Sequence, residues 1–258
     1  MAYSFEVIGS IAILQQKKSM LELKRISRKI LEEHKNIRTV LAKRGKIKGR
    51  LRKRGLKFIA GIKTFETIHK ESNCLIKLNV KTSYFSPRLS NERIEILHQV
   101  KNKEKILVLF SGVAPYALVI AKSRKDAEII AIELNREACR YAEENIKMNK
   151  LQNIKIIQGD VKKVLPRLKE AGRKFDRIVM PRPQLKDKFL KEAFLVSKKG
   201  TIINYYDFAD EEKIKEKVEE MEKEARRYKK KIKILNVKKA GGEIAPRKFR
   251  IRADFKVI

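Results

Sequence analysis

From Lys105 onward the sequence alternates short apolar runs with amphipathic stretches, and this alternation restricts the possible folds more than any other feature. Strands that alternate with helices predict a parallel sheet covered on both faces. We therefore expect residues 101–258 to form a parallel-dominated, doubly wound α/β sheet of the Rossmann-like type, closed by two C-terminal strands. The expected strands are residues 105–110, 127–134, 153–161, 175–183 and 201–208. Residues 111–123 are expected to form a tight turn that leads into a helix, and further helices are expected at residues 135–150, 186–200 and 210–231.

Residues 1–100 lack this regular alternation and are expected to form a small α+β module. A basic helix is predicted from about Lys17 to His34, after two short strands, and alternating patterns at 57–72 and 74–80 predict further strands. The block RGKIKGRLRKRG, residues 44–55, contains seven basic residues and three glycines. Such a block cannot form a core, so it indicates either a phosphate-contacting surface or a flexible solvated linker.

The net charge of +33, from 64 Lys and Arg residues against 31 Asp and Glu residues, indicates a polyanionic partner. Nucleic acid fits best, because no basic amphipathic helix with an aromatic face suggests binding to an anionic membrane. No apolar run approaches the roughly 20 residues of a membrane span, and the N-terminus does not resemble a signal peptide. Two cysteines and three histidines argue against a disulfide framework or a zinc site. We expect a cytoplasmic protein that binds no metal.

Suggestive residues follow four of the predicted strands, at the edge where a doubly wound sheet binds ligands. The turn Phe110-Ser111-Gly112 follows the first strand, Glu133 and Asp160 end the second and third, and Pro181-Arg182-Pro183 ends the fourth. This set fits S-adenosylmethionine better than a dinucleotide, because no second mononucleotide-binding half follows. Ala114 stands where G-x-G-x-x-G would have its second glycine. The competing interpretation is a generic sheet whose strand ends happen to be acidic.

The stretch YFSPRLSNER, Tyr84 to Arg93, combines an aromatic pair, two arginines and a carboxylate at the start of a predicted helix. Ser86 is suited to cap that helix and Pro87 to occupy its first turn. Arg88 and Glu92 lie four residues apart. From spacing alone, the simplest interpretation is a solvated helix face with an i,i+4 salt bridge that contributes about 0.5 kcal/mol or less.

Several motifs resemble those of the archaeal/eukaryal tRNA guanine-37 N1-methyltransferase family. They are ETIHKESNCLIKLNVKTSYFSPRLSNER, LFSGVAPYALVIAK, NIKMNKLQNIKIIQGD, VMPRPQLKDKFL and APRKFRIRADFK, which follow in this order. The similarity runs nearly end to end, and YFSPRLSNER is its most specific part. It implies a class I methyltransferase that uses S-adenosyl-L-methionine, acts on the tRNA anticodon stem-loop and is a monomer. It also implies that the extra N-terminal domain of many members is not part of this sequence.

The resemblance assigns roles to single residues. Glu92 takes the position of the proposed general base, Tyr84 lines the nucleotide pocket, and Arg52 or Arg54 holds the target base. The chemistry is consistent with these roles, because guanine N1 carries a proton at neutral pH and O6 gains charge as the proton leaves. The cofactor-binding residues implied are Arg88, Phe110, Ser111, Gly112, Tyr116, Glu133, Leu134, Asp160, Val161 and Pro181. The substrate-binding residues implied are Lys46, Lys48, Lys53, Arg93, Arg182, Pro183 and Arg247.

Three departures from the family pattern leave other functions open. Val108 replaces an acid, Ala114 replaces a glycine, and Pro181-Arg182-Pro183 replaces the Asn-Leu-Pro motif whose asparagine helps grip the guanine. Either Arg182 substitutes for that asparagine, or the target base or transferred group differs. The alternatives are therefore aminocarboxypropyl transfer in wyosine synthesis, which the retained Glu92 argues against, and a non-catalytic RNA-binding protein with a decayed methyltransferase site.

Overall fold

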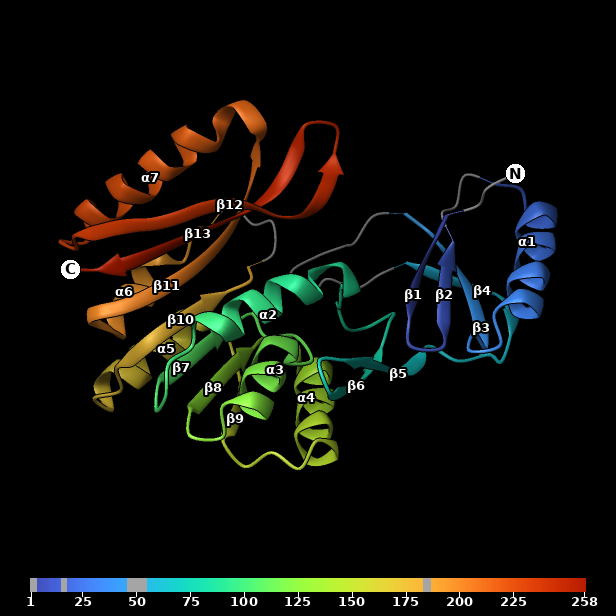
Figure 1. Cartoon of the computed structure of the whole chain (residues 1–258), viewed down its shortest axis with the longest axis horizontal. Coiled ribbons are helices and arrows are strands. Elements are labelled where there is room, and N and C mark those ends of the chain that lie inside the picture. Colours follow the sequence, from blue (N-terminus) through green and yellow to red (C-terminus); the bar gives the residue numbers. More distant parts are fainter. Residues whose placement is uncertain (1–3, 15–17, 46–54, 183–186) are drawn as a thin grey trace.

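The computed structural model describes residues 4–14, 18–45, 55–182 and 187–258 of the 258-residue chain. These residues form a four-stranded sheet, a two-stranded hairpin and a seven-stranded sheet, in that order along the chain (Figure 1). Among the described helices, none has the length and apolar composition needed to span a membrane.

The N-terminal sheet contains β1 (Phe5–Ile8), β2 (Ile11–Leu14), β3 (Thr39–Lys43) and β4 (Leu56–Gly61). Helix α1 (Met20–Glu33) joins the parallel strands β2 and β3. Its start, predicted near Lys17, is set three residues later by Ser19, whose side chain accepts from the Glu22 amide while the Glu22 carboxylate accepts from Ser19. One face of the sheet packs on α1, and the other joins the core of the neighbouring hairpin.

That hairpin, β5 (Glu66–Glu71) and β6 (Cys74–Asn79), attaches to the C-terminal part of the chain. The backbone amides of Leu75 and Lys77 donate to the side-chain oxygens of Asn149 and Asn145 at 2.9 and 2.7 Å. A 3₁₀ turn η1 (Pro87–Leu89) and helix α2 (Ser90–Gln99) then lead to the large sheet. The predicted division of the chain at residue 100 stays a prediction.

The large sheet has the strand order β12-β13-β11-β10-β7-β8-β9. Its strands are β7 (Lys105–Leu109), β8 (Glu128–Glu133), β9 (Ile154–Gln158), β10 (Phe175–Met180), β11 (Ser197–Asp210), β12 (Ile232–Ala245) and β13 (Lys248–Val257). The five strands from β11 to β9 run parallel, and β13 and β12 add antiparallel pairs. The chain starts in the middle at β7 and winds first one way and then the other. This confirms the doubly wound, Rossmann-like fold.

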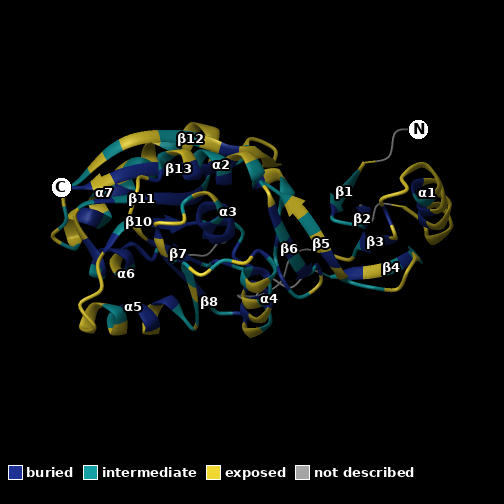
Figure 2. Ribbon diagram, turned by 60° about the horizontal axis from the view of Figure 1, so that its bottom comes forward, coloured by how far each residue is buried: buried dark blue, intermediate teal, exposed yellow. Residues whose placement is uncertain are grey.

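Helices cover both faces of this sheet, as side-chain alternation along each strand requires. On β7, Ile106 and Val108 join one core with α2, α3 (Pro115–Ser123) and α4 (Arg136–Met148). Leu107 and Leu109 join the other core with α5 (Val161–Glu170), α6 (Leu190–Leu195) and α7 (Ile214–Arg227), the last of which follows the 3₁₀ turn η2 (Glu211–Lys213). Figure 2 shows the result: the central strands are buried and the outer helix faces are exposed.

One prediction about a single element was wrong, and one helix was not predicted. The helix expected over residues 186–200 ends at Leu195, and β11 starts at Ser197 because this segment pairs with β10 before a register shift. Helix α5 was not predicted, since Pro166 lies inside it and Asp160 was assigned only to the end of a strand. Asp160 in fact also caps α5, accepting from the Lys162 amide at 3.0 Å.

Candidate active site

The carboxyl ends of β7, β8, β9 and β10 surround a cavity of about 980 Å³, including its open mouth. We call it the cofactor cavity. Apolar side chains and a few polar groups line it, as is usual for small-molecule sites. Its lining includes nine of the ten residues predicted to bind a cofactor, namely Phe110, Ser111, Gly112, Tyr116, Glu133, Leu134, Asp160, Val161 and Pro181. The sequence thus predicted which residues meet here, although ligand contact itself stays a prediction.

The turn after β7 holds an unusual backbone. Phe110, Gly112 and Ala114 have φ values of +54°, +57° and +65°, in the left-handed region that favours glycine. A side chain at Gly112 would lie 3.4 Å from the Tyr84 carbonyl oxygen, so the turn passes close to the YFSPRLSNER segment. The buried Ser111 hydroxyl has no hydrogen-bond partner among the described residues. A buried donor of this kind is suited to a ligand.

Glu133 holds this turn in place from the end of β8. Its two carboxylate oxygens accept from the backbone amides of Gly112 and Asn135, each at 2.8 Å. Asn135 in turn caps α4, accepting from the amides of Glu137 and Ala138. The carboxylate therefore links the turn after β7 to the N-terminus of α4 and lies at the wall of the cofactor cavity.

A second cavity of about 960 Å³, again including its mouth, adjoins the first. It lies between the N-terminal sheet, the YFSPRLSNER segment and the β12–β13 hairpin, and we call it the hairpin cavity. Tyr84, Ser86, Leu89 and Arg250 line both cavities. Arg88, predicted to bind the cofactor, lines only the hairpin cavity. Ser86 provides no side-chain cap, and Pro87 opens the 3₁₀ turn η1 rather than α2 itself.

Glu92 does not lie on a solvated helix face, so the simple salt-bridge interpretation was wrong. Its side chain is buried, with only 3% of the residue exposed, and it binds groups far along the chain. Arg252 Nη1 lies 2.6 Å and Lys238 Nζ 3.2 Å from its oxygens, and the Tyr206 hydroxyl donates at 3.2 Å. Burial raises the pKa of Tyr206 well above its usual value, which keeps this hydroxyl a donor. Glu92 is not part of the described lining of either cavity.

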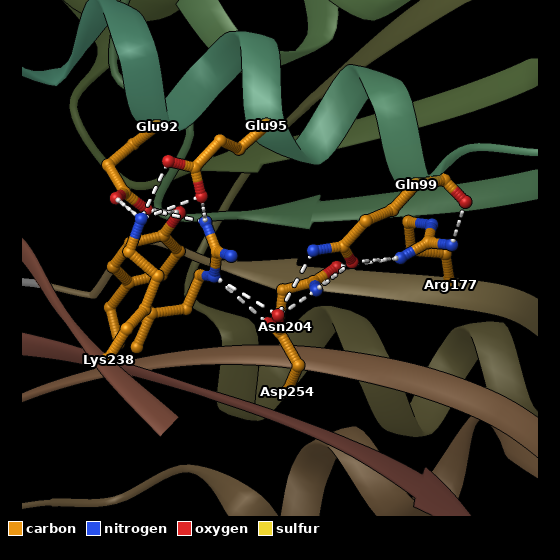
Figure 3. Close-up of polar contacts among 9 residues, drawn as sticks. Glu92, Glu95, Gln99, Arg177, Asn204, Lys238 and Asp254 are labelled. Atoms are coloured by element: carbon orange, nitrogen blue, oxygen red, sulfur yellow. Dashed lines mark hydrogen bonds and ion pairs between the residues drawn. The ribbon is translucent and has the colours of Figure 1, made fainter. Parts of the chain in front are cut away.

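These contacts belong to a longer polar network between α2 and the sheet (Figure 3). Glu95 binds Lys238 at 2.6 Å and Arg252 at 3.1 Å, and the hydrogen bond from Lys238 lowers the pKa of Glu95. Asp254 binds Arg252 on the same strand and accepts from Gln99 and Asn204. The chain of contacts then continues from Gln99 and Asn204 to Arg177, which pairs with Glu104. Helix α2 thus contacts the sheet through paired polar groups as well as through its apolar core residues.

Two arginines predicted to bind substrate are held by partners within the protein, and their contact with substrate stays a prediction. Arg93 is buried and donates twice to Glu71, through Nε and through Nη2 at 2.6 Å, which joins α2 to β5. Arg182 is also buried, and its guanidinium donates to Asp207 at 2.9 Å and to the Tyr205 hydroxyl at 3.1 Å. The fold therefore holds the Arg182 guanidinium in place, and its predicted role toward the target base stays a prediction.

The remaining predicted residues lie at the surface or outside the described ranges. Arg247 is exposed at the tip of the β12–β13 hairpin, 3.6 Å from Glu212. Lys46, Lys48, Arg52, Lys53, Arg54 and Pro183 fall outside the described residues. Sequence reasoning missed Asn135, Gly159, Phe189 and Arg250 in the cavity lining. Asn135 and Gly159 are next to predicted positions, whereas Phe189 and Arg250 carry no local signal.

Comparison with known proteins identifies the family. The model of the TRM5/TYW2 methyltransferase domain matches residues 67–235, and that of the TYW2 N-terminal domain matches residues 1–64. The chain belongs to the TRM5/TYW2 methyltransferase family. The two matches meet near the start of β5, so the hairpin and the YFSPRLSNER segment fall within the region that matches the methyltransferase domain.

Relatives within the TRM5/TYW2 family align with nearly the whole chain. One is tRNA (guanine(37)-N(1))-methyltransferase Trm5b of Pyrococcus abyssi, 36% identical over 98% of this chain and 74% of that protein, whose crystal structure gives a TM-score of 0.86. Another is tRNA (guanine(37)-N(1))/4-demethylwyosine(37)-methyltransferase Taw22 of Nanoarchaeum equitans, 35% identical over 99% of this chain and 100% of that protein. A third is TYW2 of M. jannaschii, solved in complex with AdoMet, with 26% identity over 99% of this chain and 100% of that one and a TM-score of 0.71.

Proposed function

We propose that this protein is an S-adenosylmethionine-dependent tRNA methyltransferase that methylates N1 of guanine-37, next to the anticodon. Membership of the TRM5/TYW2 family and the names of the aligned relatives support the methyl transfer and the tRNA substrate. The observation that carries the proposal is the cofactor cavity at the ends of β7 to β10, which adjoins a second cavity large enough for a nucleotide. The net charge of +33 suits an RNA substrate.

The residues around the cofactor cavity fit S-adenosylmethionine. The buried Ser111 hydroxyl has no described partner and is suited to a polar group of the ligand, and Gly112 allows close backbone approach. We propose that Glu133, which ends β8 at the cavity wall, holds the ribose hydroxyls and that Asp160 binds the adenine. The bound cofactor supplies an electrophilic methyl group on a sulfonium.

Methylation of guanine N1 also requires removal of its proton, and we propose Glu92 as the acceptor, with Arg52 or Arg54 near O6. The structure adds a condition to this role. Because Arg252, Lys238 and Tyr206 bind the Glu92 carboxylate, RNA binding has to replace at least one of these contacts by the target base. Without such an exchange, Glu92 only fastens α2 to the sheet.

A second activity, methylation of 4-demethylwyosine at the same position, is favoured by one comparison. The relative named for both reactions aligns over its full length with this chain. The replacement of Asn-Leu-Pro by Pro181-Arg182-Pro183 points the same way, because the guanine-gripping asparagine is missing.

The test is nucleoside mass spectrometry after incubation with S-adenosylmethionine and an unmodified tRNA transcript. The proposal predicts 1-methylguanosine from a transcript with guanine-37 and none from the same transcript with adenine-37. A parallel reaction on tRNA that carries 4-demethylwyosine tests the second activity. Calorimetric titration with S-adenosylmethionine separates a decayed enzyme from the wrong substrate. Cofactor binding without any methylated product would refute the guanine-37 assignment, and absence of cofactor binding would indicate a non-catalytic RNA-binding protein.

A further inference from the structure

Arg250 is a buried cation at the junction of the two cavities. It lies on β13 with 5% of the residue exposed, and it lines both the cofactor cavity and the hairpin cavity. Its guanidinium carbon lies 4.9 Å from the centre of the Phe208 ring on the neighbouring strand. A stacking contact of this kind orients the guanidinium but leaves its N–H donors available.

Within the described residues, Arg250 differs from every other buried arginine. Arg93, Arg177, Arg182 and Arg252 each pair with a carboxylate. For Arg250 the described residues provide neither an ion pair nor a side-chain hydrogen bond. Burying a charge without a partner is unfavourable by several kcal/mol in effective terms, so buried charges are paired in almost all proteins. The missing partner is therefore expected to be an anion that arrives from one of the two cavities.

The hairpin cavity indicates which anion this is. Arg88, which is exposed, lines that cavity and likewise has no carboxylate partner among the described residues. Lys43 on the opposite wall lies 3.8 Å from Glu6 and is already paired. Glu6 and Glu243 also line this cavity, but among the described residues neither pairs with Arg88 or Arg250. Two such arginines on one cavity suit phosphate recognition, because each guanidinium presents a planar fork of donors. A single cofactor carboxylate would account for Arg250 but leave Arg88 unexplained.

We propose that Arg250, with Arg88 at the mouth of the hairpin cavity, binds a backbone phosphate of the RNA beside the target nucleotide. The proposal rests on the proposed RNA substrate and adds the site that holds the strand next to the cofactor. A phosphate contact positions the RNA without reading its sequence. Arg250 then fixes how deeply the nucleotide enters between the β12–β13 hairpin and the YFSPRLSNER segment.

The first experiment measures binding, so its result does not depend on which base is methylated. Affinities of the wild type, Arg250→Gln and Arg250→Lys are measured for an anticodon stem-loop RNA and, separately, for S-adenosylmethionine. Arg250→Gln should weaken RNA binding about 10- to 100-fold, the range of a charge-assisted hydrogen bond, and leave cofactor affinity within about twofold. Arg250→Lys should lose less. The control is Arg173→Gln. This residue is an exposed arginine beside the N-terminal ends of the parallel strands, away from both cavities, and its loss should have little effect.

The second experiment replaces single phosphates around the target nucleotide by neutral methylphosphonates. One replacement should weaken binding to the wild type and have little further effect on Arg250→Gln, since both changes remove the same contact. If Arg250→Gln does not fold, the same scan with Arg250→Met decides, because that variant also lacks the cation. Weaker cofactor binding with intact RNA binding would assign Arg250 to the cofactor carboxylate and overturn the proposal. Unchanged affinity for both ligands would overturn it as well. Failure of the wild type to bind RNA would instead refute the proposed function.

Discussion

Arg250 and Arg252 lie two residues apart on β13, so both side chains point to the same face of the sheet, and both are buried, with 5% and 2% of the residue exposed. Their surroundings are opposite. Arg252 binds Glu92, Glu95 and Asp254, whereas Arg250 stacks on Phe208 and borders two cavities. Around Arg252 the buried charges are paired within the protein. Around Arg250 the buried charge has no carboxylate partner among the described residues and is available to a ligand.

The same contrast extends beyond these two arginines. On the α2 side of β13, paired polar groups form a continuous network, while on the other face Ile251, Ala253 and Phe255 pack in an apolar core. Beside the cofactor cavity, by contrast, the Ser111 hydroxyl has no partner among the described residues and Ala114 has a left-handed backbone. An unpaired donor and a strained backbone at one position are common at functional sites.

Glu92 provides the strongest test of this contrast, because its carboxylate is paired within the protein and it is nevertheless the proposed base. Glu92→Gln keeps the shape and should reduce the single-turnover rate of methyl transfer by about 10²- to 10⁴-fold at saturating RNA and cofactor. The matched control is Glu95→Gln, which removes a carboxylate that binds the same Lys238 and Arg252. Quenched-flow measurement of product, with melting curves of both variants, provides the data. Equal and small rate losses in the two variants would show that Glu92 only joins α2 to the sheet and does not act as the base.

The second prediction compares the two arginines directly in stability. Arg252→Met leaves Glu92 and Asp254 buried without their main cation, so unfolding should become easier by about 3–5 kcal/mol. Arg250→Met removes a buried charge that has no described partner, so the free energy of unfolding should stay the same or rise. Urea denaturation of both variants measures the difference. If Arg250→Met were the more destabilising change, Arg250 would stabilise the folded protein as Arg252 does, and its charge would not be kept for a ligand.

The third prediction concerns the cofactor edge. Glu133→Ala should weaken S-adenosylmethionine binding by about 1.5–3 kcal/mol, since it removes a charge-assisted acceptor and releases the amides of Gly112 and Asn135. RNA affinity should stay nearly unchanged. Calorimetry with each ligand measures both. Equal losses for RNA and cofactor would mean that Glu133 maintains the local fold and has no specific role toward the cofactor.

The sequence predicted which residues line the cofactor cavity, but it did not predict the polar network between α2 and the sheet. The reason is physical. Parallel strands end at one edge, so Gly112, Glu133 and Asp160 come together whenever the strand order is right. The network depends instead on long-range contacts: Glu92 meets Arg252 and Lys238 only because β12 and β13 return beside α2. Spacing along one helix suggested Arg88 as the partner, which shows how a local rule fails when a buried tertiary partner competes.

The smallest effect is expected at Ala114, where the strain at the ligand edge can be measured. Its left-handed backbone, φ +65° and ψ +33°, is unfavourable for alanine by about 1–2 kcal/mol. Ala114→Gly relieves this strain, but it loses a buried methyl group worth about 0.8 kcal/mol and gains unfolded-chain entropy worth about 0.4–1 kcal/mol. These contributions nearly cancel, so the free energy of unfolding should change by less than about 1 kcal/mol.

The control for this variant is Ala117→Gly, three residues later in helix α3 and equally buried. That position has no left-handed backbone to relieve, so the same loss of a methyl group should destabilise the protein by about 1–2 kcal/mol. The difference between the two variants, measured by denaturant unfolding, is the strain held at the ligand edge. A difference near zero would show that the turn before α3 is relaxed. The two regions would then differ only in whether their buried charges are paired, and the unpaired Arg250 would be the main evidence for that difference.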